Sequence, residues 1–152
     1  MLVTTPGESV EARYVDESTL KTITRLRQSF KLGLNDDVYQ DLQAVASACG
    51  DVGWDGFSAQ PVIAETAQKA MGFLQALPLE SPSPSVGAEP DGHVTLEWYK
   101  STRQTLSVSV SPDGELHFAA LMGSNWQFGT ETFLGEIPRS ILALIRRVTD
   151  YV

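Results

Sequence analysis

The residues that most often build metal and nucleophilic sites are scarce in this chain, which holds two histidines and a single cysteine. His93 and His117 fall on separate predicted strands, and Cys49 lies far from both along the sequence. The usual zinc spacings, a CxxC pair or two ligands three or four residues apart on a helix, do not occur. We therefore predict no metal site. Cys49 is interpreted as a small core residue, because one thiol cannot form an internal disulfide.

Signatures of nucleotide binding and of nucleophilic catalysis are also missing. The sequence contains no GxxxxGK(S/T) or GxGxxG loop for phosphates and no GxSxG turn for a serine nucleophile, so we expect no cofactor. A Ser-His-Asp set could still assemble in space from Ser58, one of the histidines, and Asp55 or Asp91, because triads are defined by geometry. A serine-rich chain offers such sets by chance, and Ser58 is equally suited to cap the helix that follows it.

Paired carboxylates are the remaining route to catalysis. Two acids held about 5–9 Å apart can share the acid and base work of a hydrolase. Candidates lie in a glycine-rich loop and around the predicted sheet: Asp51, Asp55, Asp91, Glu97, Asp113 and Glu115. Their spacing selects no pair, and Asp113 is already accounted for as a turn former. The residues therefore favour a non-enzymatic role, and we assign no catalytic residue.

The most distinctive local feature is the aromatic loop Trp54-Asp55-Gly56-Phe57. One interpretation is that Trp54 and Phe57 fold back into the core around a turn made by Asp55 and Gly56, since large aromatics are usually buried. On that interpretation, Trp54→Ala should destabilise the fold by several kcal/mol. The alternative is an exposed anchor for a partner, because aromatic residues dominate binding hot spots. The candidate binding residues are Trp54, Asp55 and Phe57 in the loop, with Trp98, Tyr99 and Trp126 on the strands.

Hydrophobic periodicity indicates the elements that must position these residues. Helical spacing predicts helices over residues 18–31, from Asn35 to Gly50, from Pro61 to Leu77, and from Pro138 onward. The stretch 78–90 is rich in proline and serine, so we expect an extended connector without regular hydrogen bonding.

After the connector the period becomes two. Alternation predicts strands over 94–99, 106–111 and 116–121, and a fourth around 126–133 that Gly129 interrupts with a bulge. Asp113-Gly114 is a strong hairpin signal between the second and third strands. The expected fold is α+β: N-terminal helices, then a four-stranded antiparallel β-meander and a C-terminal helix. We expect the helices to pack on one sheet face, leaving a serine-rich face open to solvent or a partner.

A chain of 152 residues is expected to form one domain. We predict an N-terminal arm over residues 1–16 and a single α+β domain over 17–152. Within that domain, 17–77 is the helical half, 78–90 the connector, and 91–152 the meander with its helix. Self-association is compatible with this organisation, since the polar arm can pack on a neighbouring copy.

Charge and hydropathy limit the function classes. The net charge of −8 argues against direct nucleic-acid binding, which needs clustered Lys and Arg. It is compatible with an acidic surface that binds a basic protein. The sequence holds no run of about 18 apolar residues, so we expect no membrane partner. The first residues lack the basic and apolar regions of a secretory signal, and we expect a cytoplasmic protein.

One set of motifs resembles a known group. Trp54-Asp55-Gly56-Phe57-x-Ala59 is followed by Pro61, then by Asp91-Gly92-x-Val94-x-Leu96-Glu97-Trp98 and a second Asp-Gly hairpin. This order is similar to that of small uncharacterised bacterial proteins with a W-D-G-aromatic-x-A loop and a D-G-x-(I/V)-x-L-E-W strand. The resemblance covers about residues 53–148 and implies a bacterial or phage-borne accessory gene. The group has no established activity, so no functional residue is carried over.

Three functions remain open at this stage. The first is a non-enzymatic protein-binding factor, such as an antitoxin, immunity or defence-associated protein. The second is an acidic nucleic-acid mimic that inhibits a nucleic-acid enzyme, which would require carboxylates in rows on one face. The third is a small hydrolase that uses carboxylates or a Ser-His pair, which would require a pocket where a histidine meets an acid.

Overall fold

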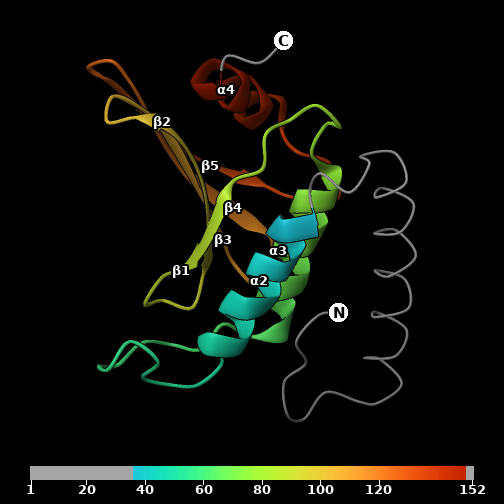
Figure 1. Cartoon of the computed structure of the whole chain (residues 1–152), viewed down its shortest axis with the longest axis vertical. Helices are drawn as coiled ribbons and strands as arrows, with labels where there is room; N and C mark the ends of the chain where they lie inside the picture. Colours follow the sequence, from blue (N-terminus) through green and yellow to red (C-terminus); the bar gives the residue numbers. More distant parts are fainter. Residues whose placement is uncertain (1–35, 150–152) are drawn as a thin grey trace.

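The computed structural model describes residues 36–149 (Figure 1). Two helices come first, α2 (Asp36–Ala48) and α3 (Ala64–Ala76), and α4 (Arg139–Thr149) comes last. The strands between them are β1 (Ser85–Ala88), β2 (Val94–Ser101), β3 (Gln104–Val110), β4 (Glu115–Met122) and β5 (Asn125–Thr132). The predicted arm (1–16), the predicted helix over 18–31 and residues 150–152 lie outside the described residues.

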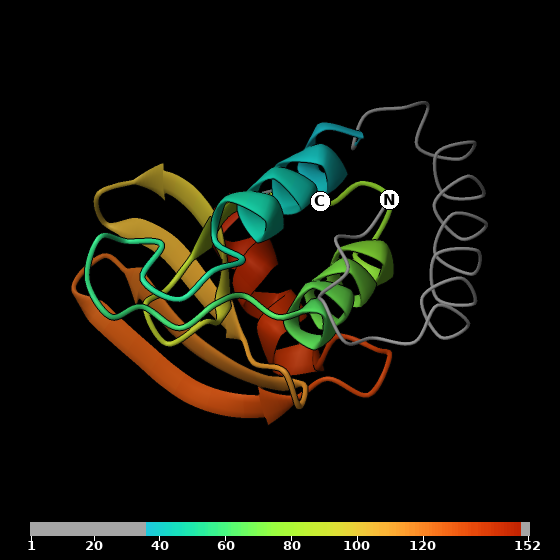
Figure 2. The ribbon, with the colours of Figure 1, turned by 90° about the horizontal axis from the view of Figure 1, so that it is seen from below.

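The strands form one antiparallel sheet in the order β1-β2-β3-β4-β5, so every strand pairs with its neighbour in sequence. The three helices lie on the same side of this sheet (Figures 1 and 2). The predicted α+β class and the helix-covered sheet are therefore confirmed for the described residues. Among the helices between residues 36 and 149, none combines the length and apolar character of a membrane span.

The prediction of four strands is wrong, because β1 adds a fifth at the edge of the sheet. It lies inside the stretch predicted as an unpaired connector (78–90), and its register with β2 runs from Ser85↔Glu97 to Ala88↔Val94. Prolines cannot donate to a sheet ladder, but residues 85–88 fall between Pro84 and Pro90 and keep their N–H groups. Four residues are too few to show a period of two, so hydrophobic alternation does not predict this strand.

The core lies between the sheet and the helices. The inward residues of β2 to β4 alternate with outward ones, and the largest fully buried side chains come from α2, α3, α4 and these strands: Leu42, Phe73, Leu74, Leu96, Leu106, Leu116, Ile141 and Ile145. The predicted stripe of α4 is buried as expected, with Ile141, Leu144, Ile145 and Val148 all inside. Helix α3 begins at Ala64 rather than Pro61, because the preceding residues are held extended: Gln60 N donates to Pro90 O at 2.8 Å and Val62 N to Cys49 O at 2.8 Å.

Gly129 does not bulge β5, contrary to expectation. The register continues through it, with Phe118 of β4 opposite. A Cβ atom on Gly129 would lie 2.5 Å from Cζ of Phe118, so glycine leaves room for that ring. The only register shift recorded in the ladders of the described sheet lies between Tyr99 and Ser101.

Candidate functional site

The face of the sheet turned away from the helices, here called the open face, is organised in cross-strand rows. Inward residues such as Leu96 and Val108 are buried, so their neighbours along each strand must point outward. The ladder registers align these outward residues into three rows: Thr95-Ser109-His117-Thr130, Glu97-Ser107-Ala119-Phe128, and Tyr99-Thr105-Leu121-Trp126. One end of the open face is therefore polar and titratable, and the other end is aromatic.

Two turns of the same type border the polar end. Residues 89–93 (Glu-Pro-Asp-Gly-His) and 111–115 (Ser-Pro-Asp-Gly-Glu) both contain Pro-Asp-Gly, and each is closed by two backbone hydrogen bonds of 2.8–3.1 Å. The glycines, Gly92 and Gly114, both have φ of +88°, a conformation that glycine adopts without strain. In a meander, the β1–β2 and β3–β4 connections lie at the same end of the sheet, so the two turns are near neighbours.

The two histidines meet at this end. The rings of His93 and His117 stack with centroids 5.9 Å apart and planes within 7°. His93 Nδ1 lies 3.4 Å from Asp91 Oδ2, while His117 Nε2 lies 3.4 Å from Glu115 Oε2. His117 Nδ1 also lies 3.1 Å from the Thr130 hydroxyl. The registers that pair β2 with β3 and β3 with β4 thus bring together two histidines that are 24 positions apart in the sequence.

In the second turn, the carboxylate of Asp113 is engaged by other groups of the same turn. Asp113 accepts hydrogen bonds from the Ser111 hydroxyl and from the Glu115 backbone N–H, and these two contacts are the main reasons that its pKa is lowered. A smaller contribution comes from the positive charge that His93 can carry. The carboxylate of Asp113 is therefore satisfied within its own turn.

The structure brings two members of the predicted Ser-His-Asp combinations together, but not in the geometry of a triad. Asp91 Oδ2 and the hydroxyl of Ser109, rather than Ser58, both lie 3.4 Å from Nδ1 of His93. A triad needs the acid on one ring nitrogen and the serine on the other, so that the imidazole can pass a proton between them. Two partners on one nitrogen cannot do this. The arrangement gives no support to nucleophilic catalysis.

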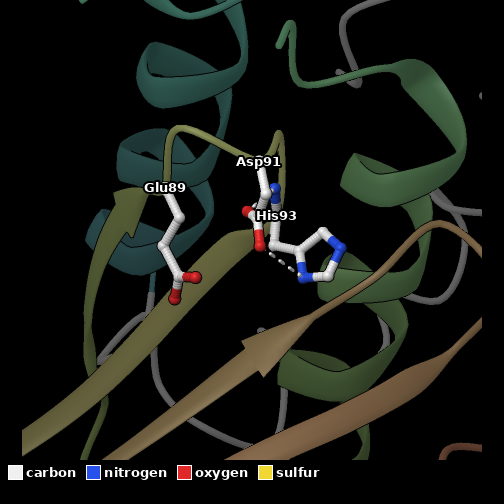
Figure 3. A group of neighbouring side chains, drawn as sticks. All are labelled: Glu89, Asp91 and His93. Carbon is white, nitrogen blue, oxygen red and sulfur yellow. Dashed lines mark hydrogen bonds and ion pairs between the residues drawn. The ribbon is translucent and has the colours of Figure 1, made fainter. Parts of the chain in front are cut away.

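Glu89, Asp91 and His93 form a second kind of cluster, which the sequence reasoning missed (Figure 3). Each side chain offers one atom that could bind a metal, and the three atoms lie within 4.8 Å of one another. A hollow of about 350 Å³ opens beside them, lined also by Ser107, Ser109, His117, Phe118 and Ala119. The members of the cluster are two residues apart along the chain, which is neither the helical nor the CxxC spacing of zinc ligands. The sequence pattern that could have indicated this cluster is a potential metal ligand at every second position of the Pro-Asp-Gly turn, at 89, 91 and 93.

The aromatic loop is ordered by its own hydrogen bonds. Asp55 Oδ1 accepts from Phe57 N at 2.9 Å and from Ala59 N at 3.2 Å, and Trp54 Nε1 donates to Gln60 O at 2.7 Å. Trp54 is partly buried, but Phe57 is 87% exposed. The core interpretation is therefore wrong for Phe57, because the tight turn that Asp55 closes directs this ring to solvent.

The strand aromatics are divided between the two faces of the sheet. Trp98 is buried among the core residues and donates its indole N–H to Pro82 O at 2.9 Å, so it is not available as a surface anchor. Tyr99 and Trp126 lie on the open face and are more than half exposed. Trp126 stacks on Phe128, with centroids 5.6 Å apart and planes within 9°. Phe128 was not among the predicted binding residues, although alternation with Trp126 in the same strand could have indicated it.

Strand β5 is the longer of the two edge strands of the described sheet. It has eight residues, compared with four in β1 at the other edge. A groove of about 550 Å³ lies between β5 and α4. It is lined by Trp126, Gln127 and Phe128 of β5, by Ser140, Ala143, Leu144 and Arg147 of α4, and by Phe118 of β4. Among the described residues, the outer side of this edge strand has no strand partner, so β5 presents backbone groups together with exposed aromatic rings.

Comparison of the chain with protein-family models, with curated proteins and with solved structures finds no match. No relative therefore supplies an activity or a site.

Proposed function

We propose that this chain is a non-enzymatic protein-binding accessory factor of the antitoxin, immunity or defence-associated kind, and that its partner is a basic protein. The observation that carries the proposal is the aromatic end of the open face, where Tyr99, Trp126 and Phe128 are 61%, 56% and 71% exposed. In the same cross-strand row, Leu121 pairs with Trp126 and extends this apolar surface, while Thr105 lies between Leu121 and Tyr99.

Exposure of these rings is unfavourable unless something covers them. A contiguous apolar patch on a protein surface often marks an interaction site, whereas apolar residues exposed singly need no explanation. Aromatic side chains supply large contact areas with little rotamer entropy to lose, which is why they concentrate at the centres of interfaces. The rings of Trp126 and Phe128 already stack on each other, so ordering them on binding should cost little conformational entropy.

The edge position of β5 adds a second source of affinity. Its outer backbone N–H and C=O groups can pair with a strand from a partner, while side-chain pockets provide specificity. The groove between β5 and α4 is lined in part by Trp126 and Phe128, so an added strand would contact these exposed rings and the groove together. We infer that the partner binds along β5.

Charge supports the basic character of the partner. The chain has a net charge of −8. Three exposed carboxylates, those of Asp91, Asp113 and Glu115, lie in the two turns at the polar end of the open face. Such a field raises the rate at which a positively charged protein associates, and the effect falls as ionic strength rises.

The test is affinity capture from the native host with the full chain and matched variants. Trp126→Ala and Phe128→Ser remove the aromatic pair, and Leu134→Ser is the control because Leu134 is 87% exposed but lies outside β5. We expect one stoichiometric basic protein to be recovered by the wild type and the control and lost from both β5 variants. Equal recovery with all four proteins would contradict the proposal.

The identity of a captured partner distinguishes the proposal from one of the two alternatives, the acidic nucleic-acid mimic. Recovery of a nucleic-acid enzyme whose activity the chain inhibits, in a manner that depends on Asp91 and Asp113 rather than on Trp126, would favour the acidic mimic. Both turns at the polar end carry an aspartate at the same position, which is the observation that keeps this alternative in the test.

A further inference from the structure

We propose that Glu89, Asp91 and His93 bind a divalent transition-metal ion, with Zn²⁺ as the best match, and that the open coordination position faces the hollow on the open face. This inference does not depend on the proposed function, because the cluster lies at the polar end of the sheet and the aromatic edge at the other. All three ligands come from one five-residue turn (Figure 3).

The geometry of Asp91 and His93 is the first argument. Oδ2 of Asp91 and Nδ1 of His93 face each other at 3.4 Å. Both atoms carry lone pairs, so a proton or a metal ion must lie between them for the contact to be attractive. Two ligands that each lie about 2 Å from a tetrahedral zinc are about 3.3 Å apart, and this pair already has that separation.

The free and engaged oxygens of the carboxylates are the second argument. Asp91 uses Oδ1 to accept the His93 backbone N–H at 3.0 Å, which leaves Oδ2 for a ligand. Glu89 uses Oε1 to accept the Thr95 hydroxyl, which holds its side chain over the open face. One oxygen of each acid therefore orients the group while the other remains available, an arrangement typical of oriented metal ligands.

The second turn supplies an internal comparison. It has the same Pro-Asp-Gly centre and the same backbone hydrogen bonds, but Ser111 and Glu115 stand where the first turn has Glu89 and His93. There the Asp carboxylate is engaged by the Ser111 hydroxyl, and no grouping of three ligand atoms results among the described residues. The turn conformation alone therefore does not create the cluster. The identities of its two end residues do.

The first turn is also held rigidly from outside. Pro90 O accepts a hydrogen bond from Gln60 N, and a Cβ on Gly92 would lie 2.7 Å from Pro61 O, so the turn fits closely against the segment before α3. The His117 ring stacks on His93 and limits its rotation. Ligands that are fixed before binding lose less entropy when the ion arrives.

The donor set indicates the class of metal. An imidazole nitrogen with two carboxylate oxygens suits zinc and similar transition ions, whereas magnesium and calcium prefer oxygen alone. Three protein ligands leave a fourth position for water or for a donor from a partner. The hollow of about 350 Å³ beside the cluster contains room for it, and its lining holds no Lys or Arg to repel a cation.

The experiment is a titration of Zn²⁺ into the full chain, in which isothermal titration calorimetry measures the binding heat. Glu89→Gln and Asp91→Asn keep the oxygen that accepts the structural hydrogen bond, so each variant should retain its turn. We expect one ion per chain in the wild type, and affinity at least about tenfold weaker in Glu89→Gln, Asp91→Asn and His93→Gln. Asp113→Asn, in the other turn, is the matched control and should bind as the wild type does.

A measurement on the wild type alone guards against loss of folding in a variant. In NMR spectra, Zn²⁺ should shift the ring signals of His93 and leave the indole N–H of Trp126 in place. Absence of binding heat and of ring shifts would overturn the proposal. The proposal would also be overturned if His117→Gln lost Zn²⁺ binding while Glu89→Gln and Asp91→Asn kept it. That result would place the ion between the two histidines, without the acids as ligands.

Discussion

Trp98 and Tyr99 are consecutive residues of β2, yet Trp98 is 2% exposed and Tyr99 is 61% exposed, because successive side chains of a strand point to opposite faces. The Trp98 ring lies 6.4 Å from the Phe73 ring in the core. Tyr99 belongs to the aromatic end of the open face. Substitution of Trp98 should therefore lower stability, whereas substitution of Tyr99 should weaken partner binding.

Trp98→Ala should cost about 3–5 kcal/mol of unfolding free energy, because it removes a large buried ring and its hydrogen bond to Pro82 O. Tyr99→Ala should change stability by about 0.5 kcal/mol or less, as an exposed substitution does, and should weaken capture of the partner. Urea denaturation measures the first effect and affinity capture the second. Equal destabilisation by the two substitutions would show that the assignment of faces is wrong.

The aromatic loop gives a prediction of its own. Trp54 is only partly buried and makes one hydrogen bond through its indole N–H, so Trp54→Ala should cost about 1–2 kcal/mol, well below the cost of Trp98→Ala. Phe57→Ser should leave the melting temperature almost unchanged, since Phe57 is 87% exposed and contributes little buried surface. Thermal unfolding followed by circular dichroism compares the variants. A loss in Trp54→Ala as large as in Trp98→Ala would restore the core interpretation of the loop.

The Pro-Asp-Gly turn next to the proposed metal cluster can be tested through its glycine. Gly92→Ala should be strongly destabilising, by about 2–4 kcal/mol, because the new Cβ would be strained at φ +88° and would also meet Pro61 O at 2.7 Å. Gly123→Ala is the matched control: its φ is +68°, but no atom lies within 4 Å of the added Cβ. We expect the control to lose only about 1–2 kcal/mol. Similar unfolding midpoints in urea for the two variants would argue against the contact between the turn and Pro61.

The lowered pKa of Asp113 leads us to expect that part of the folding stability depends on pH. Ser111→Ala removes the largest cause of its lowered pKa, so the pKa should rise towards the ordinary value of 3.8. A carboxylate with a depressed pKa in the folded state stabilises the fold above its unfolded pKa, and that stabilisation is lost as pH falls through the folded pKa. The stability difference between wild type and Ser111→Ala should therefore be constant above about pH 5 and shrink below about pH 4.

Carboxyl NMR titration measures the pKa of Asp113 directly, and urea unfolding at several pH values measures the stability difference. A Ser111→Ala variant with the same Asp113 titration as the wild type would mean that the hydroxyl does not engage the carboxylate in solution. Because Asp113 is exposed, raising the ionic strength should reduce the contribution of His93 and leave the two hydrogen bonds in place.

Local patterns in the sequence determined much of this fold. The apolar stripe Ile141-Leu144-Ile145-Val148 and the alternation in β2 to β4 required a helix and strands whatever their surroundings, because a side chain's face follows from its position in a periodic element. The Asp113-Gly114 hairpin followed from the φ that glycine tolerates. The alternation also separated Trp98 from Tyr99, although the predicted binding set combined them.

Only the tertiary structure decided how distant segments combine. Residues 85–88 carry too short a pattern to predict β1, and its pairing depends on β2 being within reach. Phe57 faces solvent because Asp55 closes the loop through backbone hydrogen bonds that no hydrophobic pattern encodes. The meeting of His93 with His117 depends on the register of three strands, and register is set by the packing of the whole buried face. Sequence periodicity therefore identified the elements, whereas long-range pairing assembled the candidate sites from them.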